Sequence, residues 1–295
     1  LGGDINFGIP IAEEDRITLA LGLERTSIDL PSDRRFIVPR YEEFIEREGD
    51  SFTALPVTIG WTRDSRDNAL LPTRGMEQSL SAEVAVPGGD LQYYKLRYRN
   101  TWFTPISDDL TFSLRTDLGY ADGYGSTSEL PFFENFYGGG FGSVRGFKTN
   151  ELGPRASTTG LAVETSPIGG NMLALATLEL IIPTPFLPDP RAVQAVIFTD
   201  IGNVFDTKCT ATQANCFAPS FEELRYSAGV GVTWITGIAP ISFSLGKTFN
   251  ASEFEEEEFT TQFNGQTLRR ILAQTGPHWK WVAGFLGMIA LVSVL

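Results

Sequence analysis

The stretch Phe132-Phe133-Glu134-Asn135-Phe136-Tyr137-Gly138-Gly139-Gly140-Phe141-Gly142-Ser143-Val144-Arg145-Gly146-Phe147 decides the fold of this 295-residue chain. It combines five Phe, one Tyr and five Gly with a single arginine. Loops are normally polar, because their free backbone groups need water. Here the glycines permit tight turns and close backbone approach, and the aromatic rings fill volume. We therefore predict a loop folded into an enclosed space, where Arg145 needs a carboxylate partner. The alternative is an aromatic, glycine-rich surface loop.

The segments on either side alternate between apolar and polar residues, which predicts β-strands. Between Tyr93 and Trp102, and again between Leu110 and Tyr120, one face is as apolar as a protein core and the other carries full charges. A soluble sandwich turns such an apolar face inward, whereas a transmembrane barrel turns it outward to lipid. Most segments have the length of about 9 to 12 residues that a tilted strand needs to cross a bilayer, which favours the barrel.

We expect about 11 strands in an all-β, antiparallel transmembrane barrel. The predicted strands are Asp4–Pro10, Arg16–Glu24, Leu55–Thr62, Met76–Val86, Tyr93–Trp102, Leu110–Tyr120, Met172–Ile182, Arg191–Ile201, Arg225–Ile235, Ala239–Phe249 and Phe259–Thr267.

The connections between these strands alternate between short turns and long loops. This asymmetry is typical of outer-membrane barrels, whose short turns are periplasmic and whose long loops face outward. Cys209 and Cys216 lie in a long loop, where an oxidising compartment would allow a disulfide; a metal site there lacks further ligands. The acidic runs at 41–50 and 253–258 also lie in long loops. We expect solvated charge there, with cation bridging to anionic lipid as the alternative.

Composition excludes several functions. A formal net charge of −13 argues against a nucleic-acid partner, because phosphate binding needs clustered Lys and Arg. The only histidine, His278, lies far from any other candidate site, so the chain lacks the base of a Ser-His-Asp arrangement. We expect no enzymatic activity, no catalytic residue, no cofactor and no metal.

The motif Val144-Arg145-Gly146-Phe147, preceded by Pro131 to Gly140, closely resembles the barrel of BamA-type outer-membrane protein assembly factors of Gram-negative bacteria. TamA and the two-partner secretion transporters share only the shorter core of the motif. The resemblance runs from about Gly3 to Thr267. Further matching stretches are Asp64 to Asp67 with Leu71 to Gly75, Val86 to Asp90, Glu151 to Pro154, Pro183 to Phe186 and Asp200 to Asp206.

In that family the barrel has sixteen strands, and the loop with this motif joins the eleventh and twelfth. Counting back from Phe259–Thr267 as the last strand gives the same position for the loop here. The resemblance thus implies that about five strands, and periplasmic POTRA domains, precede this chain.

The resemblance also proposes partners for Arg145. In the family the motif arginine enters the lumen and pairs with acidic residues on the wall, and the matching positions here are Glu179 and Asp200. Alternation along the strand places Asp200 on the polar face. Both faces of the strand with Glu179 are apolar, but a carboxylate within an apolar strand must face the lumen and not lipid. We expect a structural latch that fixes the loop, with Phe136, Tyr137, Gly138, Gly139 and Gly142 shaping the loop around it.

The function implied by the resemblance is insertion and folding of β-barrel proteins in the bacterial outer membrane. The implied partners are unfolded barrel clients, accessory lipoproteins of the assembly complex and outer-membrane lipid, and this part of the barrel would be inactive alone. A TamA-like or two-partner secretion barrel is one alternative. A passive pore is another, with Lys95, Arg97, Arg99 and Arg115 lining an anion-selective lumen.

The C-terminal residues depart from the family. We expect a partial barrel at 1–267, followed at 268–295 by a basic linker and an apolar, helix-like tail. The apolar run from Trp279 to Leu295 spans about 17 residues, against the roughly 20 of a transmembrane helix. A junction in the sequence, such as a fusion or reading-frame change, is the favoured explanation, and a membrane anchor is the alternative.

Overall fold

The computed structural model describes residues 1–30, 38–156, 166–183, 193–208, 217–235, 240–252 and 255. The chain divides into two compact units, Leu1–Glu257 and Glu258–Leu295, of which the second lies outside the described residues. The predicted strand Phe259–Thr267, the predicted tail and both cysteines also lie outside them. Over the described ranges, no helix is long and apolar enough to cross a membrane.

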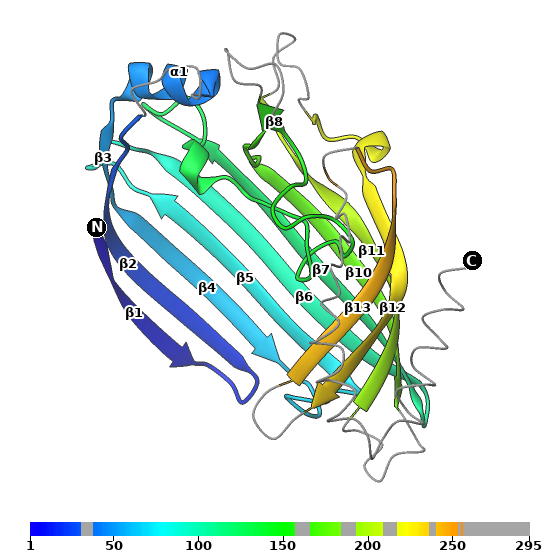
Figure 1. The fold of residues 1–295 in the computed structure, drawn as a ribbon. Helices are drawn as coiled ribbons and strands as arrows, with labels where there is room; N and C mark the ends of the chain where they lie inside the picture. Colours follow the sequence, from blue (N-terminus) through cyan, green and yellow to red (C-terminus); the bar gives the residue numbers. More distant parts are fainter. Residues whose placement is uncertain are drawn as a thin grey trace, which may run out of the picture. The chain divides into compact units, whose positions relative to one another are not determined.

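One antiparallel sheet of eleven strands dominates the first unit (Figure 1). Its order is β1-β2-β4-β5-β6-β7-β10-β11-β12-β13, and the short β3 pairs with β2. The bounds are β1 Gly2–Pro10, β2 Asp15–Ser27, β3 Ser51–Ala54, β4 Pro56–Asp64, β5 Gly75–Ala85, β6 Tyr93–Ser107, β7 Leu110–Gly123, β10 Met172–Pro183, β11 Val193–Phe205, β12 Arg225–Ile235 and β13 Pro240–Phe249. Ten of the eleven predicted strands are therefore confirmed, each next to its neighbour in sequence.

The two faces of this sheet differ in chemistry, as the alternation predicted. Residues paired across neighbouring strands point to the same side, so Asp200, Thr177 and Arg115, which pair in turn, share one face. We name this the inner face. The opposite, outer face carries apolar side chains that are more than half exposed, among them Ile5, Phe7, Leu21, Leu23 and Ile59. The other sheet among the described residues is a loop hairpin of two residues per strand. It is too short to cover this face, which contradicts a sandwich and agrees with a wall that faces lipid.

Several elements differ from the prediction. The long loop at 26–51 contains a helix, α1 (Pro39–Glu48), and strand β3 begins at the last residue of this loop. The sequence signal for α1 is weak. Pro39 at its start favours a helix, but the helix buries a single side chain, Phe44. The loop between β7 and β10 contains a short hairpin, β8 (Arg155–Ala156) with β9 (Ser166–Pro167). Strand β11 continues to Phe205 beyond its predicted end at Ile201, because Phe205 still pairs with Met172 of β10.

The long loops join one another at one end of the sheet. We name residues 132–147 the aromatic loop. Phe44 of α1 packs against Phe52 of β3 and against Phe132 and Phe133 of this loop, with ring centroids 5.5 to 6.4 Å apart. Burial raises the pKa of Tyr41, whose ring stacks on Phe132 at 4.1 Å. Ion pairs also connect the loops at this end of the sheet: Arg40–Glu129 at 3.3 Å, Arg40–Asp206, Arg47–Glu129 and Lys208–Asp122 at 3.1 Å.

The same charge should affect the stability of the barrel differently on the two faces. Leu21, near the middle of β2, lies on the outer face, and its neighbour Ala20 lies on the inner face. We expect Leu21→Arg to destabilise the barrel by about 2–4 kcal/mol, because lipid cannot hydrate the guanidinium. Ala20→Arg is the matched control and should change stability by no more than about 0.5 kcal/mol. Urea unfolding from lipid bilayers, followed by tryptophan fluorescence, measures both; equal losses would contradict this assignment of the faces.

Candidate functional site

The loop between β7 and β10 returns over the inner face of the sheet (Figure 1). Its path depends on glycines in the left-handed region of backbone conformation. Gly139 has φ +106°, and a Cβ there would lie 2.3 Å from the carbonyl oxygen of Lys148. Gly146 has φ +85°, and a Cβ there would lie 3.0 Å from Cγ2 of Thr248 in β13. Only glycine adopts such conformations without strain, so these positions allow the loop to turn directly above the wall.

Arg145 lies between two carboxylates of the wall. Its Nε donates to Oδ2 of Asp200 and its Nη2 to Oδ1, each at 2.7 Å, while Nη1 donates to Oε1 of Glu179 at 2.7 Å. The main-chain N–H of Arg145 also donates to Oδ2 of Asp200, at 3.0 Å. Asp200 therefore holds both the side chain and the backbone of the loop. We name Arg145, Glu179 and Asp200 the Arg145 latch.

Glu179 reaches the latch because of strand register. It pairs with Phe198 of β11 on one side and Ser113 of β7 on the other. Phe198 precedes Asp200 by two residues, so all of these side chains share the inner face. Glu179 and Asp200 thus approach the guanidinium from adjacent strands.

Phe198 supports the guanidinium from below. The Cζ atom of Arg145 lies 3.5 Å from the centroid of the Phe198 ring, which is a close cation–π contact. The ring itself lies over Gly229 of β12 and Gly246 of β13, which pair with each other. A Cβ on Gly229 would lie 2.7 Å from Cζ of Phe198 and 2.0 Å from the carbonyl oxygen of Leu245. Two strand glycines therefore make the space that the ring occupies.

The latch is buried. The Arg145 side chain is 9% exposed, Glu179 is 13% exposed and Asp200 is fully buried. Burial alone would lower the pKa of Arg145, but its hydrogen bonds to Asp200 and the charges of Asp200 and Glu179 hold that pKa above the ordinary value. The arginine is therefore always charged, and removing a partner would leave a buried charge unpaired.

The residues around Arg145 complete the packing. Val144 and Phe147 are fully buried and form an apolar cluster with Leu152. The N–H of Lys148 then donates to the carbonyl oxygen of Glu255, at 2.9 Å. The motif is thus held on both sides of its arginine.

Glu255 corrects one expectation. Its acidic run was expected to be solvated, but Glu255 is fully buried and accepts hydrogen bonds from Nε and Nη2 of Arg225, at 2.7 and 3.2 Å. It also accepts from the N–H of Ser252, at 2.9 Å. The cause is tertiary, because the cation that pairs with Glu255 lies 30 residues earlier, at the start of β12.

The other predicted loop residues lie near the latch but do not touch it. Phe136 is buried, packs against Gly119 and has the Lys95 ammonium 5.2 Å from its ring centroid. Tyr137 is 38% exposed, and its hydroxyl donates to the carbonyl oxygen of Ile168 at 3.3 Å. Gly138 pairs with Leu152 in an isolated bridge. Gly142 lies in open space, whereas Cys209 and Cys216 lie outside the described residues.

Four residues of the site were not predicted from the sequence: Phe198, Gly229, Gly246 and Ser227. The Ser227 hydroxyl lies 3.4 Å from Oδ2 of Asp200. The alternation placed Phe198 on the face of Asp200, and a glycine inside a strand often marks a close approach. Those signals were available, but linking the glycines to the ring needs the register of three strands.

Comparisons with known proteins agree on one family. Residues 1–267 match the model of the Omp85 superfamily domain. The outer membrane protein assembly factor BamA of Neisseria meningitidis serogroup B is 38% identical over 268 residues, which cover 82% of this chain and 33% of that protein. The BamA of Nitratidesulfovibrio vulgaris is 26% identical, covering 83% and 29%. The chain thus spans about a third of the length of these curated relatives.

A solved structure gives the same answer. The crystal structure of BamA from Haemophilus ducreyi lacking POTRA domains 1–3 superposes with a TM-score of 0.77 at 26% sequence identity. The match covers 86% of this chain and 52% of that one.

Loss of the arginine should weaken the barrel. We expect Arg145→Ala to cost about 3 to 5 kcal/mol, because it leaves the buried Asp200 carboxylate without its cation. Arg145→Lys should lose less, since the charge remains while the fork of hydrogen bonds is lost. The heat-modifiability of the barrel in gel shift measures both variants. Resistance equal to that of the unmodified chain in Arg145→Ala would contradict the latch.

The glycine support can be tested separately from the latch charges. We expect Gly229→Ala to cost about 1–3 kcal/mol, because its methyl group must displace the β13 backbone and the Phe198 ring. Gly3→Ala on β1 is the matched control, since nothing lies within 4 Å of a Cβ there. Denaturant unfolding compares the two variants, and a similar stability for both would exclude a role for Gly229 in positioning the ring.

Proposed function

This chain belongs to the Omp85 superfamily, and we propose that it is the barrel portion of an assembly factor that inserts and folds β-barrel proteins in the bacterial outer membrane. It acts as an integral membrane protein and catalyses no chemical reaction. Its clients are unfolded outer-membrane barrel proteins, and accessory lipoproteins of the assembly complex are its partners. The observation that carries the proposal is the 38% identity to a BamA over 82% of the chain.

The sheet supports this proposal through its chemistry. Its outer face presents apolar side chains along every long strand near the N-terminus, as lipid contact requires. Its inner face carries the charged residues and the latch. A strand edge with free backbone groups can pair with an incoming strand, which is the physical basis for templating a client.

The latch gives the proposed machine a fixed loop. A client that folds against a barrel wall needs that wall to keep its shape while strands are added at another place. Four hydrogen bonds from one loop residue to β10 and β11 supply such rigidity. We assign the latch this mechanical role.

A passive pore is the second candidate, because basic residues line the inner face. Two of them are engaged, however: Lys95 pairs with Glu134 at 3.0 Å, and Arg97 holds Asp117 at 2.9 and 2.6 Å. The aromatic loop packs over the same face, which favours a filled lumen over conduction.

Reconstitution distinguishes the two functions. The native full-length protein in proteoliposomes should accelerate folding of an unfolded outer-membrane barrel client, read as the heat-modifiable gel shift of the client. Planar bilayers containing the same protein should show little steady ion conductance. High conductance without client folding would favour the pore.

The Arg145→Ala variant tests the mechanical role of the latch in the same assay. It should lower the rate of client folding, because the loop is no longer fixed to β10 and β11. Protein-free liposomes give the uncatalysed rate. An unchanged rate in a variant that remains inserted would contradict the mechanical role of the latch, while leaving the insertase function standing.

A further inference from the structure

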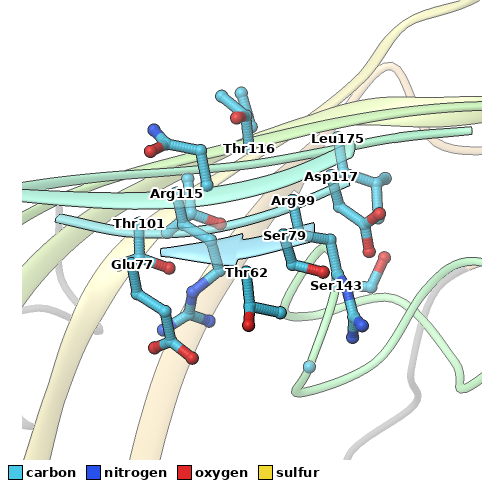
Figure 2. Close-up of a pocket in the computed structure, with 14 residues that line it drawn as sticks. Thr62, Glu77, Ser79, Arg99, Thr101, Arg115, Thr116, Asp117, Ser143 and Leu175 are labelled. Atoms are coloured by element: carbon cyan, nitrogen blue, oxygen red, sulfur yellow. The ribbon is translucent and has the colours of Figure 1, made fainter. Parts of the chain in front are cut away.

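A second feature of the inner face is a cavity that the latch does not use. Its volume is about 330 Å³, and it lies between the wall and the tip of the aromatic loop. Figure 2 shows Arg99 and Arg115 projecting from the sheet on the same side as Glu77 and Ser143. Its lining is otherwise rich in hydroxyls, from Thr62, Ser79, Thr101, Ser143 and Thr177.

Both carboxylates in the lining are already engaged. Asp117 accepts both hydrogen bonds of the Arg97 fork, at 2.9 and 2.6 Å. Glu77 pairs with Arg66 at 2.9 Å. The local negative charge is therefore compensated by arginines that do not line the cavity.

Arg99 and Arg115 are left with their charges uncompensated. Both are exposed to the cavity, and within the described ranges neither has a carboxylate within 4.0 Å. In the backbone register of β6 and β7, Arg99 lies opposite Asp117 and Thr101 lies opposite Arg115. The two arginines are therefore diagonal neighbours. Diagonal positions lie roughly 7–8 Å apart, close enough for two long side chains to reach one ligand.

Two neighbouring guanidiniums in a recess favour a negatively charged ligand. Each presents a planar fork of donors that matches a carboxylate or a phosphate. Fixed charges of one sign within a cleft also concentrate counter-ions there. The volume is at the lower end of the range for small-molecule sites, roughly 300–1,000 Å³.

We propose that this cavity is a binding site for a small, multiply charged oxyanion, a phosphate ester or a polycarboxylate. Arg99 and Arg115 bind its oxygens, and the hydroxyls of Thr101, Ser143 and Thr177 donate to the remaining ones. None of the three latch residues lines this cavity, although Arg115 also lines a smaller recess with Arg145 and Glu179. The site does not depend on the insertase function.

Two variants test the site by different means. Arg99→Gln with Arg115→Gln removes its charge. Gly142→Leu fills its space, because nothing lies within 4 Å of a Cβ on Gly142 and its φ is not left-handed. Arg16→Gln is the matched control, since Arg16 also lies on the inner face, opposite Thr62, but does not line the cavity.

The measurement is isothermal titration of the detergent-solubilised chain with inorganic pyrophosphate, citrate and glycerol phosphate, at low and high salt. We expect at least one probe to bind, with an affinity that falls as salt rises. The double arginine variant should bind it about 10-fold or more weakly, and Gly142→Leu should also weaken it. Arg16→Gln should bind as the unmodified chain does.

The probes separate the sources of the ligand. Preference for glycerol phosphate indicates a lipid headgroup, preference for pyrophosphate a free phosphate, and preference for citrate a carboxylate. Absence of binding by all three probes overturns the proposal. So does binding that survives the double variant, or that Arg16→Gln reduces equally. Heat-modifiability of each variant confirms that its barrel is folded.

Discussion

The buried guanidinium of Arg145 is the constraint on which the inner face depends. Moving a cation out of water costs several kcal/mol, and only well-placed partners recover it. Asp200 and Glu179 supply three side-chain hydrogen bonds at 2.7 Å, and Asp200 also accepts from the main chain. Since these acids belong to different strands, the pairing requires β10 and β11 to be in a single register. One arginine thus makes the position of a loop and the alignment of a wall mutually dependent.

The glycines follow from that constraint. A guanidinium lying flat on Phe198 needs the ring to lie low on the sheet, and the ring can do so only where the neighbouring strands lack side chains. Gly229 and Gly246 satisfy this condition across two adjacent strands. Gly146 permits a separate close approach, that of the loop to Thr248 of β13. The two strand glycines weaken β12 and β13 locally, and the stack of ring and cation offsets that loss.

The sequence predicted what is local and missed what is tertiary. Ten strands followed from alternation, because a period of two is a property of neighbouring residues. The side of Asp200 followed from the same alternation. The side of Glu179 followed only from its charge, since both faces of β10 are apolar and a carboxylate cannot face lipid; the pairing with Ser113 and Phe198 agrees with it. Helix α1 and the burial of Glu255 depend on partners far along the chain, Phe132 and Arg225 respectively. No local pattern encodes such contacts.

Arg97 and Arg99 illustrate how register gives the same residue type two roles. Both lie on the inner face of β6, two residues apart, and their alternation is indistinguishable in the sequence. Arg99 pairs in register with Asp117, yet the carboxylate of Asp117 accepts the fork of its diagonal neighbour Arg97. A carboxylate that binds one fork with both oxygens has little capacity left for a second. Over the described residues, the inner face therefore carries cations held in ion pairs, such as Arg97, and cations without a carboxylate within 4.0 Å, Arg99 and Arg115. An anionic ligand can be bound by the second group without displacing an existing partner.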